Sequence, residues 1–135
     1  SGPARRGRPP LPRREIVSRG VQHIQRSLRG EAAFQDIAFA VGVSQRSLNR
    51  AFDDLYGMAP HHFYLIERLH AIRGELRSAR TGDTVTSICS RFGVWDLGRM
   101  AAQYARMFHV QPAQELARAL GEMCAGPRAG SGRRR

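Results

Sequence analysis

The feature that most constrains the fold is a pattern of residues that occurs twice in the chain. In each copy a glycine is followed by an apolar anchor, an aromatic residue, a second turn position and a proline. The spacing from glycine to anchor grows from six residues to seven, which implies one extra residue in the second turn. Such a doubled unit indicates two similar subdomains or a helical repeat scaffold. The matching pairs are Gly42 and Gly93, Leu48 and Met100, Phe52 and Tyr104, Gly57 and His109, and Pro60 and Pro112.

Apolar residues recur at intervals of three and four along most of the chain, as expected for amphipathic helices. No segment of useful length alternates with a period of two, so no strand is expected. Ser44 and Asp96 are well placed to cap the helices that follow them. We therefore predict an all-α fold of about seven helices. The expected ranges are 15 to about 29, about 33–41, 45–56, 61–78, 85–92, 97–108 and 112 to about 121.

The charge of the chain is concentrated at its ends. Of the formal net charge of +11, nine positive charges come from residues 1–14 and 123–135, which contain no acidic residue. Residues 15–122 hold 13 arginines against 11 acidic residues, so charge alone does not make this part a nucleic-acid binder. We predict a flexible basic arm or linker at residues 1–14, a folded domain at 15–122 and a flexible basic tail at 123–135.

A helix-turn-helix skeleton lies in the first copy of the pattern. Ala38, Gly42 and Leu48 stand at offsets of four and six residues. A small residue lets two helices approach, glycine accepts a positive φ in the turn, and the aliphatic residue anchors the second helix. Apart from the anchor Leu48, residues 44–50 are polar and contain no acid, unlike a surface on which repeats stack. We therefore favour tandem helix-turn-helix units over a repeat scaffold.

Two stretches resemble the DNA-binding domain of AraC-type transcription regulators. IAFAVGVSQRSLNRAFDDLYGMAPHHFYLIERLHAIRGEL is similar to the first helix-turn-helix and linker helix of that family, and ICSRFGVWDLGRMAAQYARMFHVQPAQEL is similar to the second. The resemblance covers residues 16–120. It implies homeodomain-like subdomains, with a first unit at about 15–59, a linker helix at about 60–78 and a second unit at about 83–121.

The second unit departs from the family pattern at several positions. Cys89 replaces a common alanine, Val94 and Met100 replace common phenylalanines, and His109 replaces a common glycine. The first three exchanges keep a similar apolar character. His109 differs from these three. If the helix ends there in a left-handed residue, as expected at Gly57, the histidine must adopt a positive φ at some cost in strain.

The resemblance implies that two recognition helices enter successive major grooves of double-stranded DNA, roughly 34 Å apart. A linker of 18 residues, about 27 Å long, fits that span. In the second unit only Arg99 and Gln103 are strong hydrogen-bonding candidates for base edges, so it should read fewer bases directly. The expected DNA-binding residues are Ser44, Gln45, Arg46, Asn49 and Arg50 in the first unit and Gly98, Arg99, Gln103 and Arg106 in the second.

Two further features could contact DNA, although each also has a simpler explanation. Arg6-Gly7-Arg8-Pro9 resembles an AT-hook, in which Arg6 and Arg8 would lie in a minor groove, although a solvated linker explains it equally well. Trp95, the only tryptophan, could contact a groove, but at a turn between helices we expect it to be a packing lid.

The sequence predicts no enzyme, cofactor or metal site. His61, His62 and His70 have no suitably placed acidic or cysteine partner, and no catalytic triad or phosphate loop stands out. Cys89 and Cys124 form no ligand cluster and suggest a reducing compartment. The sequence has no stretch of about 18 apolar residues and no signal peptide. We therefore expect a protein of the bacterial cytoplasm without a membrane partner.

We predict a sequence-specific transcription regulator, with promoter DNA and RNA polymerase as candidate partners. The sequence leaves open whether it is an activator or a repressor. The effector or dimerisation domain that usually accompanies such units is expected to be absent from this chain. Two alternatives remain open at this stage. One is a sequence-tolerant architectural DNA binder that relies on its arginine-rich ends. The other is a helical protein-interaction module that has lost DNA binding, which is plausible because the second unit has few hydrogen-bonding side chains on its exposed face.

Overall fold

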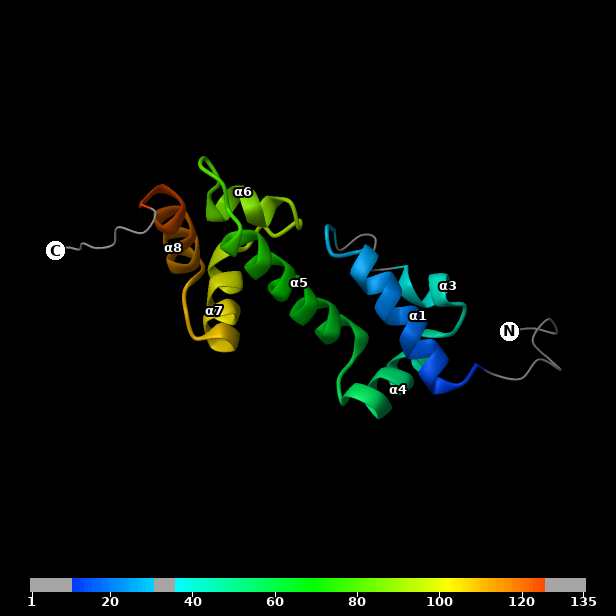
Figure 1. Ribbon diagram of the computed structural model, residues 1–135. Coiled ribbons are helices and arrows are strands. Elements are labelled where there is room, and N and C mark those ends of the chain that lie inside the picture. Colours follow the sequence, from blue (N-terminus) through cyan, green and yellow to red (C-terminus); the bar gives the residue numbers. More distant parts are fainter. Residues whose placement is uncertain (1–10, 31–35, 126–135) are drawn as a thin grey trace. The chain divides into compact units, whose positions relative to one another are not determined.

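The structure is a computed structural model that describes residues 11–30 and 36–125. The chain divides into two compact units at the boundary between Glu67 and Arg68. Over the described ranges there are seven helices and no strand, which confirms the predicted all-α fold (Figure 1). None of these helices is both long and apolar enough to cross a membrane.

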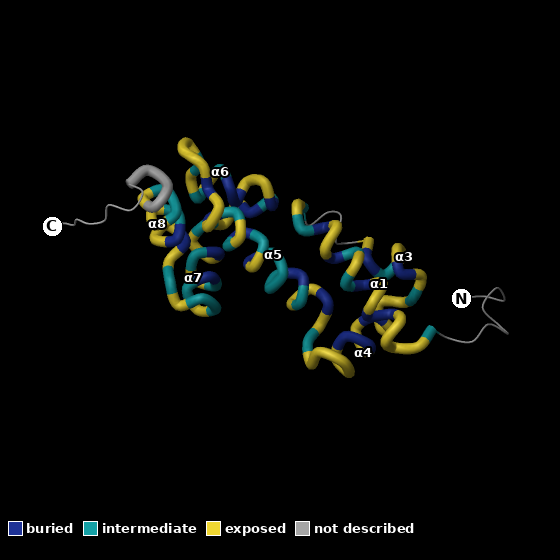
Figure 2. The backbone as a smooth tube through the Cα atoms, in the orientation of Figure 1, coloured by how far each residue is buried: buried dark blue, intermediate teal, exposed yellow. Residues whose placement is uncertain are grey.

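The first unit contains α1 (Arg13–Arg26), α3 (Ile37–Val41), α4 (Gln45–Tyr56) and the beginning of α5 (Pro60–Arg77). α1 packs against both α3 and α4, and the dark blue stretches of Figure 2 mark the residues buried there. The core consists of apolar side chains from all four helices, and Tyr64 supplies the contribution of α5. Its buried members are Ile16, Val17, Ile24, Ile37, Val41, Leu48, Ala51, Phe52 and Tyr64.

The close approach of α1 and α4 depends on Gly20. A Cβ atom placed on Gly20 would lie 2.7 Å from Cε1 and 2.9 Å from Cζ of Phe52. Phe52 is fully buried, so its ring cannot move aside without disturbing the core. An aromatic group continues the packing toward α5, because the Phe63 ring lies 5.7 Å from that of Phe52 and 4.8 Å from that of Tyr56.

Backbone signals in the sequence define both ends of α4. Gly42 ends α3 with φ of 88°, and Gly57 ends α4 with φ of 69°, a region where a side chain would be strained. The Ser44 hydroxyl accepts a hydrogen bond from the Ser47 backbone N–H at 3.1 Å. This bond is the predicted N-cap, and the range of α4 is the predicted one.

The second unit contains the rest of α5, α6 (Val85–Ser90), α7 (Leu97–Phe108) and α8 (Pro112–Ala125). A reciprocal pair of 2.9 Å hydrogen bonds between Thr84 and Ser87 caps the start of α6. Burial raises the pKa of the Cys89 thiol, which behaves here as a core residue. The buried apolar residues of this unit are Leu69, Ile72, Leu76, Ala79, Ile88, Cys89, Phe92, Val94, Met100 and Tyr104.

A buried polar group joins three helices of the second unit. The Glu115 side chain, only 4% exposed, accepts hydrogen bonds from Arg73 Nε at 2.8 Å and from the Tyr104 hydroxyl at 3.2 Å. The Arg73 guanidinium also lies 4.6 Å from the centre of the Phe108 ring. Desolvation, followed by the charge of Glu115, raises the pKa of Tyr104. The hydroxyl therefore stays protonated and donates to the carboxylate.

A more exposed ionic group connects α5 to the loop before α6. Arg91 donates to Glu75 Oε1 at 2.6 Å and to Asp83 Oδ1 at 2.7 Å. The Arg80 backbone N–H also donates to Asp83 at 2.9 Å, and this bond, followed by the one from Arg91, lowers the pKa of the Asp83 carboxyl. Exposed ion pairs contribute little individually, so this group orients the loop more than it stabilises the unit.

Some helix limits differ from the sequence expectation. α1 begins at Arg13, two residues early, because Pro12 precedes it and the Pro12 carbonyl accepts from the Ile16 N–H, so the arm predicted at residues 1–14 overlaps the helix. α6 ends at Ser90 instead of Phe92, and α8 continues to Ala125. The start of the helix expected near residue 33 lies outside the described residues.

Gly20→Ala should destabilise the protein by about 1–3 kcal/mol, because the new methyl group overpacks the contact with Phe52. Gly74→Ala is the matched control. Gly74 lies inside α5, and a Cβ added there would have no neighbouring atom within 4 Å, so alanine should stabilise by about 0.5–1 kcal/mol. Urea denaturation followed by circular dichroism measures both. A Gly20→Ala variant as stable as Gly74→Ala would contradict the close packing of α1 on α4.

Glu115→Ala should cost about 2–3 kcal/mol, because it leaves the buried Tyr104 hydroxyl without an acceptor and Arg73 without its carboxylate. Tyr104→Phe removes only one hydrogen bond and should cost about 1 kcal/mol. Arg118→Ala, an exposed change on the same helix α8, should lie within about 0.5 kcal/mol of the wild type. Thermal unfolding ranks the three, and equal effects of Glu115→Ala and Arg118→Ala would refute the role of the buried group.

Candidate nucleic-acid interface

The first turns of α4 present the five residues predicted to read DNA in the first unit. On the other side of the helix, Leu48, Ala51 and Phe52 are fully buried. Because these side chains hold α4 against the core, its polar side chains must face away from it. All five predicted residues are exposed: Ser44, Gln45, Arg46, Asn49 and Arg50.

Three of these five polar side chains are already bonded within the helix. Gln45 Nε2 donates to Asn49 Oδ1 at 2.9 Å, which holds the two amides side by side along α4. The Ser44 hydroxyl accepts from the Ser47 N–H and donates to its hydroxyl at 3.1 Å, so Ser44 is first a capping residue. Neither Arg46 nor Arg50 forms an ion pair with any part of the chain that the structure describes, and both guanidinium groups face solvent.

The helix α7 occupies the corresponding place in the second unit. Met100 and Tyr104 are its buried anchors, matching Leu48 and Phe52 of α4. The Asp96 side chain caps α7 by accepting from the Arg99 N–H at 3.0 Å, as predicted from the sequence. α7 thus has the same construction as α4, and its range is also the predicted one.

The exposed face of α7 offers fewer hydrogen-bonding groups than that of α4. Arg99 is 77% exposed, and its Nε lies 4.0 Å from the Asp96 carboxylate. Gly98 and Arg106 are exposed, whereas Gln103 is half-buried. The Asp96 carboxylate also places a negative charge beside Arg99. The predicted residues therefore lie on α7, but they form a weaker polar surface. Arg6 and Arg8, the predicted minor-groove residues, lie outside the described residues.

The end of α7 bears out the expectation for His109. Its φ is 61°, and among the described residues it is the only one other than glycine with a positive φ. The His109 N–H donates to the Ala105 carbonyl at 2.8 Å, which closes the helix as Gly57 closes α4. The structure thus preserves the helix end at the cost of a strained histidine.

The expectation that Trp95 is a packing lid is wrong, because its side chain is 82% exposed. Val94 on one side of it is buried, and Asp96 on the other caps α7. The side chain of Trp95, which lies between these two residues, points outward. The position of Trp95 at a turn does not predict whether its side chain points into the core or into solvent. The sequence shows only that the second turn has one more residue than the first.

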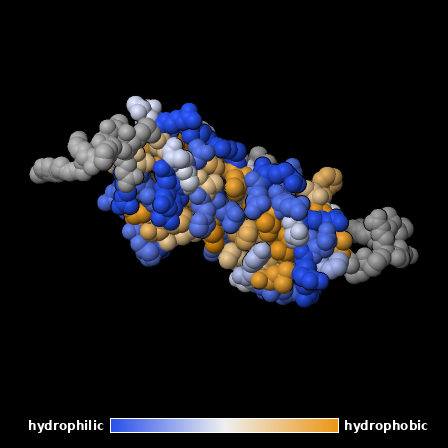
Figure 3. All heavy atoms as spheres, viewed as in Figure 1, coloured by the Kyte–Doolittle hydropathy of each residue, from blue (hydrophilic) through white to orange (hydrophobic). Residues whose placement is uncertain are grey.

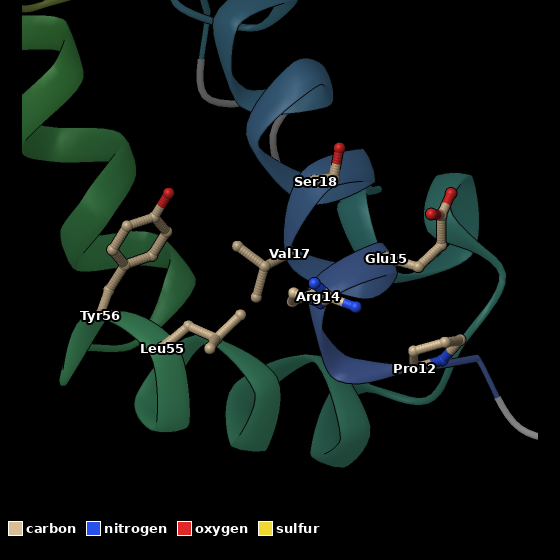
Figure 4. Close-up of a pocket in the computed structure, with 7 residues that line it drawn as sticks. All are labelled: Pro12, Arg14, Glu15, Val17, Ser18, Leu55 and Tyr56. Carbon is tan, nitrogen blue, oxygen red and sulfur yellow. The ribbon is translucent and has the colours of Figure 1, made fainter.

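A hollow of about 500 Å³ lies in the first unit, away from the predicted DNA-binding residues. α1 and the C-terminal end of α4 form its walls (Figure 4). Leu55 continues the apolar spacing of Leu48 and Phe52 along α4, but it is 46% exposed there, as is Tyr56. Figure 3 shows hydrophobic residues at the surface over this part of the unit. The lining residues are Pro12, Arg14, Glu15, Val17, Ser18, Leu55 and Tyr56.

No group of three or more His, Cys, Asp or Glu side chains within residues 11–30 and 36–121 could hold a metal ion. His61, His62 and His70 lie on α5, where the His61 ring is 5.9 Å from that of Tyr64 and the His70 ring is 5.2 Å from that of Phe108. The His61 and His70 rings therefore pack on aromatic neighbours.

Comparison with known sequences finds a family of helix-turn-helix domains whose model matches residues 37–118. A probable thc operon regulatory protein of Rhodococcus erythropolis is 32% identical over 110 residues, which cover 81% of this chain and 32% of that protein. The XylDLEGF operon transcriptional activator of Pseudomonas putida is 29% identical over 111 residues, covering 76% of this chain and 35% of that protein. The chain thus spans about a third of the length of these curated relatives.

Solved structures show the same fold. A probable AraC family transcriptional regulator from Rhodopseudomonas palustris CGA009 superposes with a TM-score of 0.71 at 27% identity, over 78% of this chain and 97% of that one. An AraC-type regulator from Chromobacterium violaceum gives a TM-score of 0.68 at 25% identity, over 84% of this chain and 96% of that one.

Proposed function

Because the chain belongs to the AraC family of DNA-binding transcription regulators, we propose that its two recognition helices bind promoter DNA with unequal roles. The family is one of regulators and not of enzymes. The observation that carries the proposal is the contrast between α4, with two exposed arginines and a bonded amide pair, and α7, with a glycine and an arginine beside an aspartate. α4 reads base edges, and α7 mainly positions the protein on the duplex.

The reading role of α4 follows from the chemistry of its exposed side chains. Arg46 and Arg50 can donate two hydrogen bonds each to a guanine edge, and Gln45 or Asn49 can pair with an adenine. The bond between Gln45 and Asn49 holds both amides in one orientation before DNA arrives, which reduces the entropy lost on binding. Sequence preference should therefore be strongest in the half of the site that α4 contacts.

The positioning role of α7 follows from its smaller set of donors. Arg99 and Arg106 are exposed cations suited to phosphate oxygens, which carry no direct sequence information. Gln103 is half-buried and Gly98 has no side chain, so direct base contacts are few. The second half of the DNA site should tolerate more base changes than the first.

We further propose that the protein acts at bacterial promoters, in the cytoplasm, as part of a transcription activator. The support is its similarity to an operon transcriptional activator of Pseudomonas putida. RNA polymerase is then the expected second partner. Selection of bound duplexes from a random pool, followed by footprinting, tests the DNA-binding proposal directly. Two protected segments about one helical turn apart are expected, and a single short segment would show that only one unit engages DNA.

Replacing Arg46 and Arg50 together by alanine should weaken binding to the selected duplex by about 30-fold or more, because each bidentate guanine contact is worth about 1–3 kcal/mol. Arg14→Ala with Arg118→Ala removes the same charge from exposed positions on α1 and α8 and is the matched control. Fluorescence anisotropy with labelled duplexes measures both. The control should lose only the small electrostatic part, equally on specific and random DNA.

Two outcomes favour the other interpretations. Equal affinity for selected and random duplexes, with a salt dependence abolished by trimming both arginine-rich ends, would make the protein an architectural DNA binder. If Arg46→Ala with Arg50→Ala bound the selected duplex as the wild type does, the chain would be better explained as a protein-interaction module.

Gly98→Ala should retain or slightly increase stability and yet weaken DNA binding about fivefold. A Cβ on Gly98 meets only the Asp96 carboxylate at 3.9 Å, so the folded chain has room for it. If DNA approaches the α7 backbone here, however, the methyl group displaces a contact worth about 1 kcal/mol, comparable to one hydrogen bond. Gly74→Ala is the control for alanine in a helix away from α7. Unchanged affinity of Gly98→Ala would remove Gly98 from the interface.

A further inference from the structure

Trp95 is the largest apolar side chain of the second unit that its fold leaves uncovered. The strongly exposed large apolar residues of the described chain are Phe39 at 90% and Trp95 at 82%. Phe39 lies on α3, the first helix of its helix-turn-helix, whereas Trp95 lies directly before the cap of α7. Trp95 is therefore the exposed aromatic residue at the start of a recognition helix.

Comparison of the two turns identifies Trp95 as an extra residue. In the first unit, one residue, Val43, separates Gly42 from the cap Ser44. In the second unit, both Val94 and Trp95 separate Gly93 from the cap Asp96. Val43 and Val94 both turn inward, half-buried and buried respectively. The added position thus contributes nothing to the core of the described unit.

The surroundings of Trp95 on the chain are those of the proposed DNA contact. Asp96 is bonded to the Arg99 backbone, which fixes the start of α7 and the residue before it. Arg99, on the first turn, is 77% exposed. An indole can pack its flat face on a deoxyribose or a thymine methyl group and donate its N–H to a phosphate oxygen. It offers both a large contact area and one hydrogen bond where α7 otherwise has few donors.

We propose that Trp95 contacts the DNA backbone beside the groove that α7 enters, packing its indole on a sugar and donating its N–H to a phosphate oxygen. This inference rests on the proposed DNA-binding function and adds a residue to it. The contact supplies affinity and fixes the position of α7 while adding little base specificity. It explains how a recognition helix with a glycine and few polar groups can still hold one half of a DNA site.

The experiment uses the intrinsic fluorescence of the chain, which reports on Trp95 because no other tryptophan is present. Titration with the selected duplex should quench or shift the emission, with the same midpoint as anisotropy of the labelled duplex. Acrylamide quenching should fall severalfold in the complex. Trp95→Ala should weaken binding about tenfold, and Trp95→Phe, which keeps a ring but loses the N–H, should fall between it and the wild type.

Phe39→Ala is the matched control, since it removes the other highly exposed aromatic side chain from a helix that is not a recognition helix. Its affinity should equal that of the wild type. Thermal unfolding of the Trp95 variants should be unchanged, because the exposed indole packs on little of the unit.

The outcomes separate this inference from the function on which it rests. If the selected duplex binds with the expected dependence on Arg46 and Arg50, but acrylamide quenching is unchanged or Trp95→Ala binds as the wild type does, the Trp95 contact is refuted and the function stands. If no duplex is selected or bound, the function fails and the contact fails with it. If a protein partner, and not DNA, protects Trp95 from acrylamide, the residue belongs to a protein interface.

Discussion

The burial of one apolar stripe on each recognition helix determines where the remaining side chains of that helix can lie. Leu48, Phe52 and Tyr104 have no exposed surface, and Met100 is only 3% exposed. Because the period of the helix is fixed, holding these anchors in the core turns the intervening polar positions outward. The exposed face of α4 is thus a consequence of its packing, and changes that loosen the core would misplace the residues predicted to bind DNA without touching them.

The two units satisfy this constraint by different means. In the first, α1 crosses α4 closely at Gly20, and Phe52, Tyr56 and Phe63 continue the aromatic packing toward α5. In the second, a buried carboxylate replaces part of that apolar contact, as Glu115 joins Tyr104 of α7 to Arg73 of α5. Such a polar group is tolerated only where every member is satisfied. The first unit therefore depends on close apolar packing at this contact, whereas the second adds directed hydrogen bonds to its apolar core.

Much of the fold could be predicted from the sequence because its signals are local. Ser44 and Asp96 cap α4 and α7, and residues 57 and 109 end them, so both helices have the predicted ranges. The strained φ of His109 was also predictable, since the matching position in the first unit is a glycine. The exposure of Leu55 and Trp95 was not, because apolar character and spacing do not say whether another element covers a residue. The positions of the predicted DNA-binding residues on exposed helix faces agree with the sequence, whereas the DNA contacts themselves remain predictions.

The unequal exposed faces of α4 and α7 suggest how the two copies of a duplicated unit can take different roles in DNA binding. A helix that reads bases must hold several donors in a fixed geometry, and the bond between Gln45 and Asn49 would provide this in the role proposed for α4. A helix that mainly positions the protein needs fewer oriented donors and more contact area near the phosphates. The second turn has one additional residue, and that residue is an exposed tryptophan. The single extra position in the repeat therefore lies directly before α7, where an indole would add contact area if that helix positions the protein as proposed.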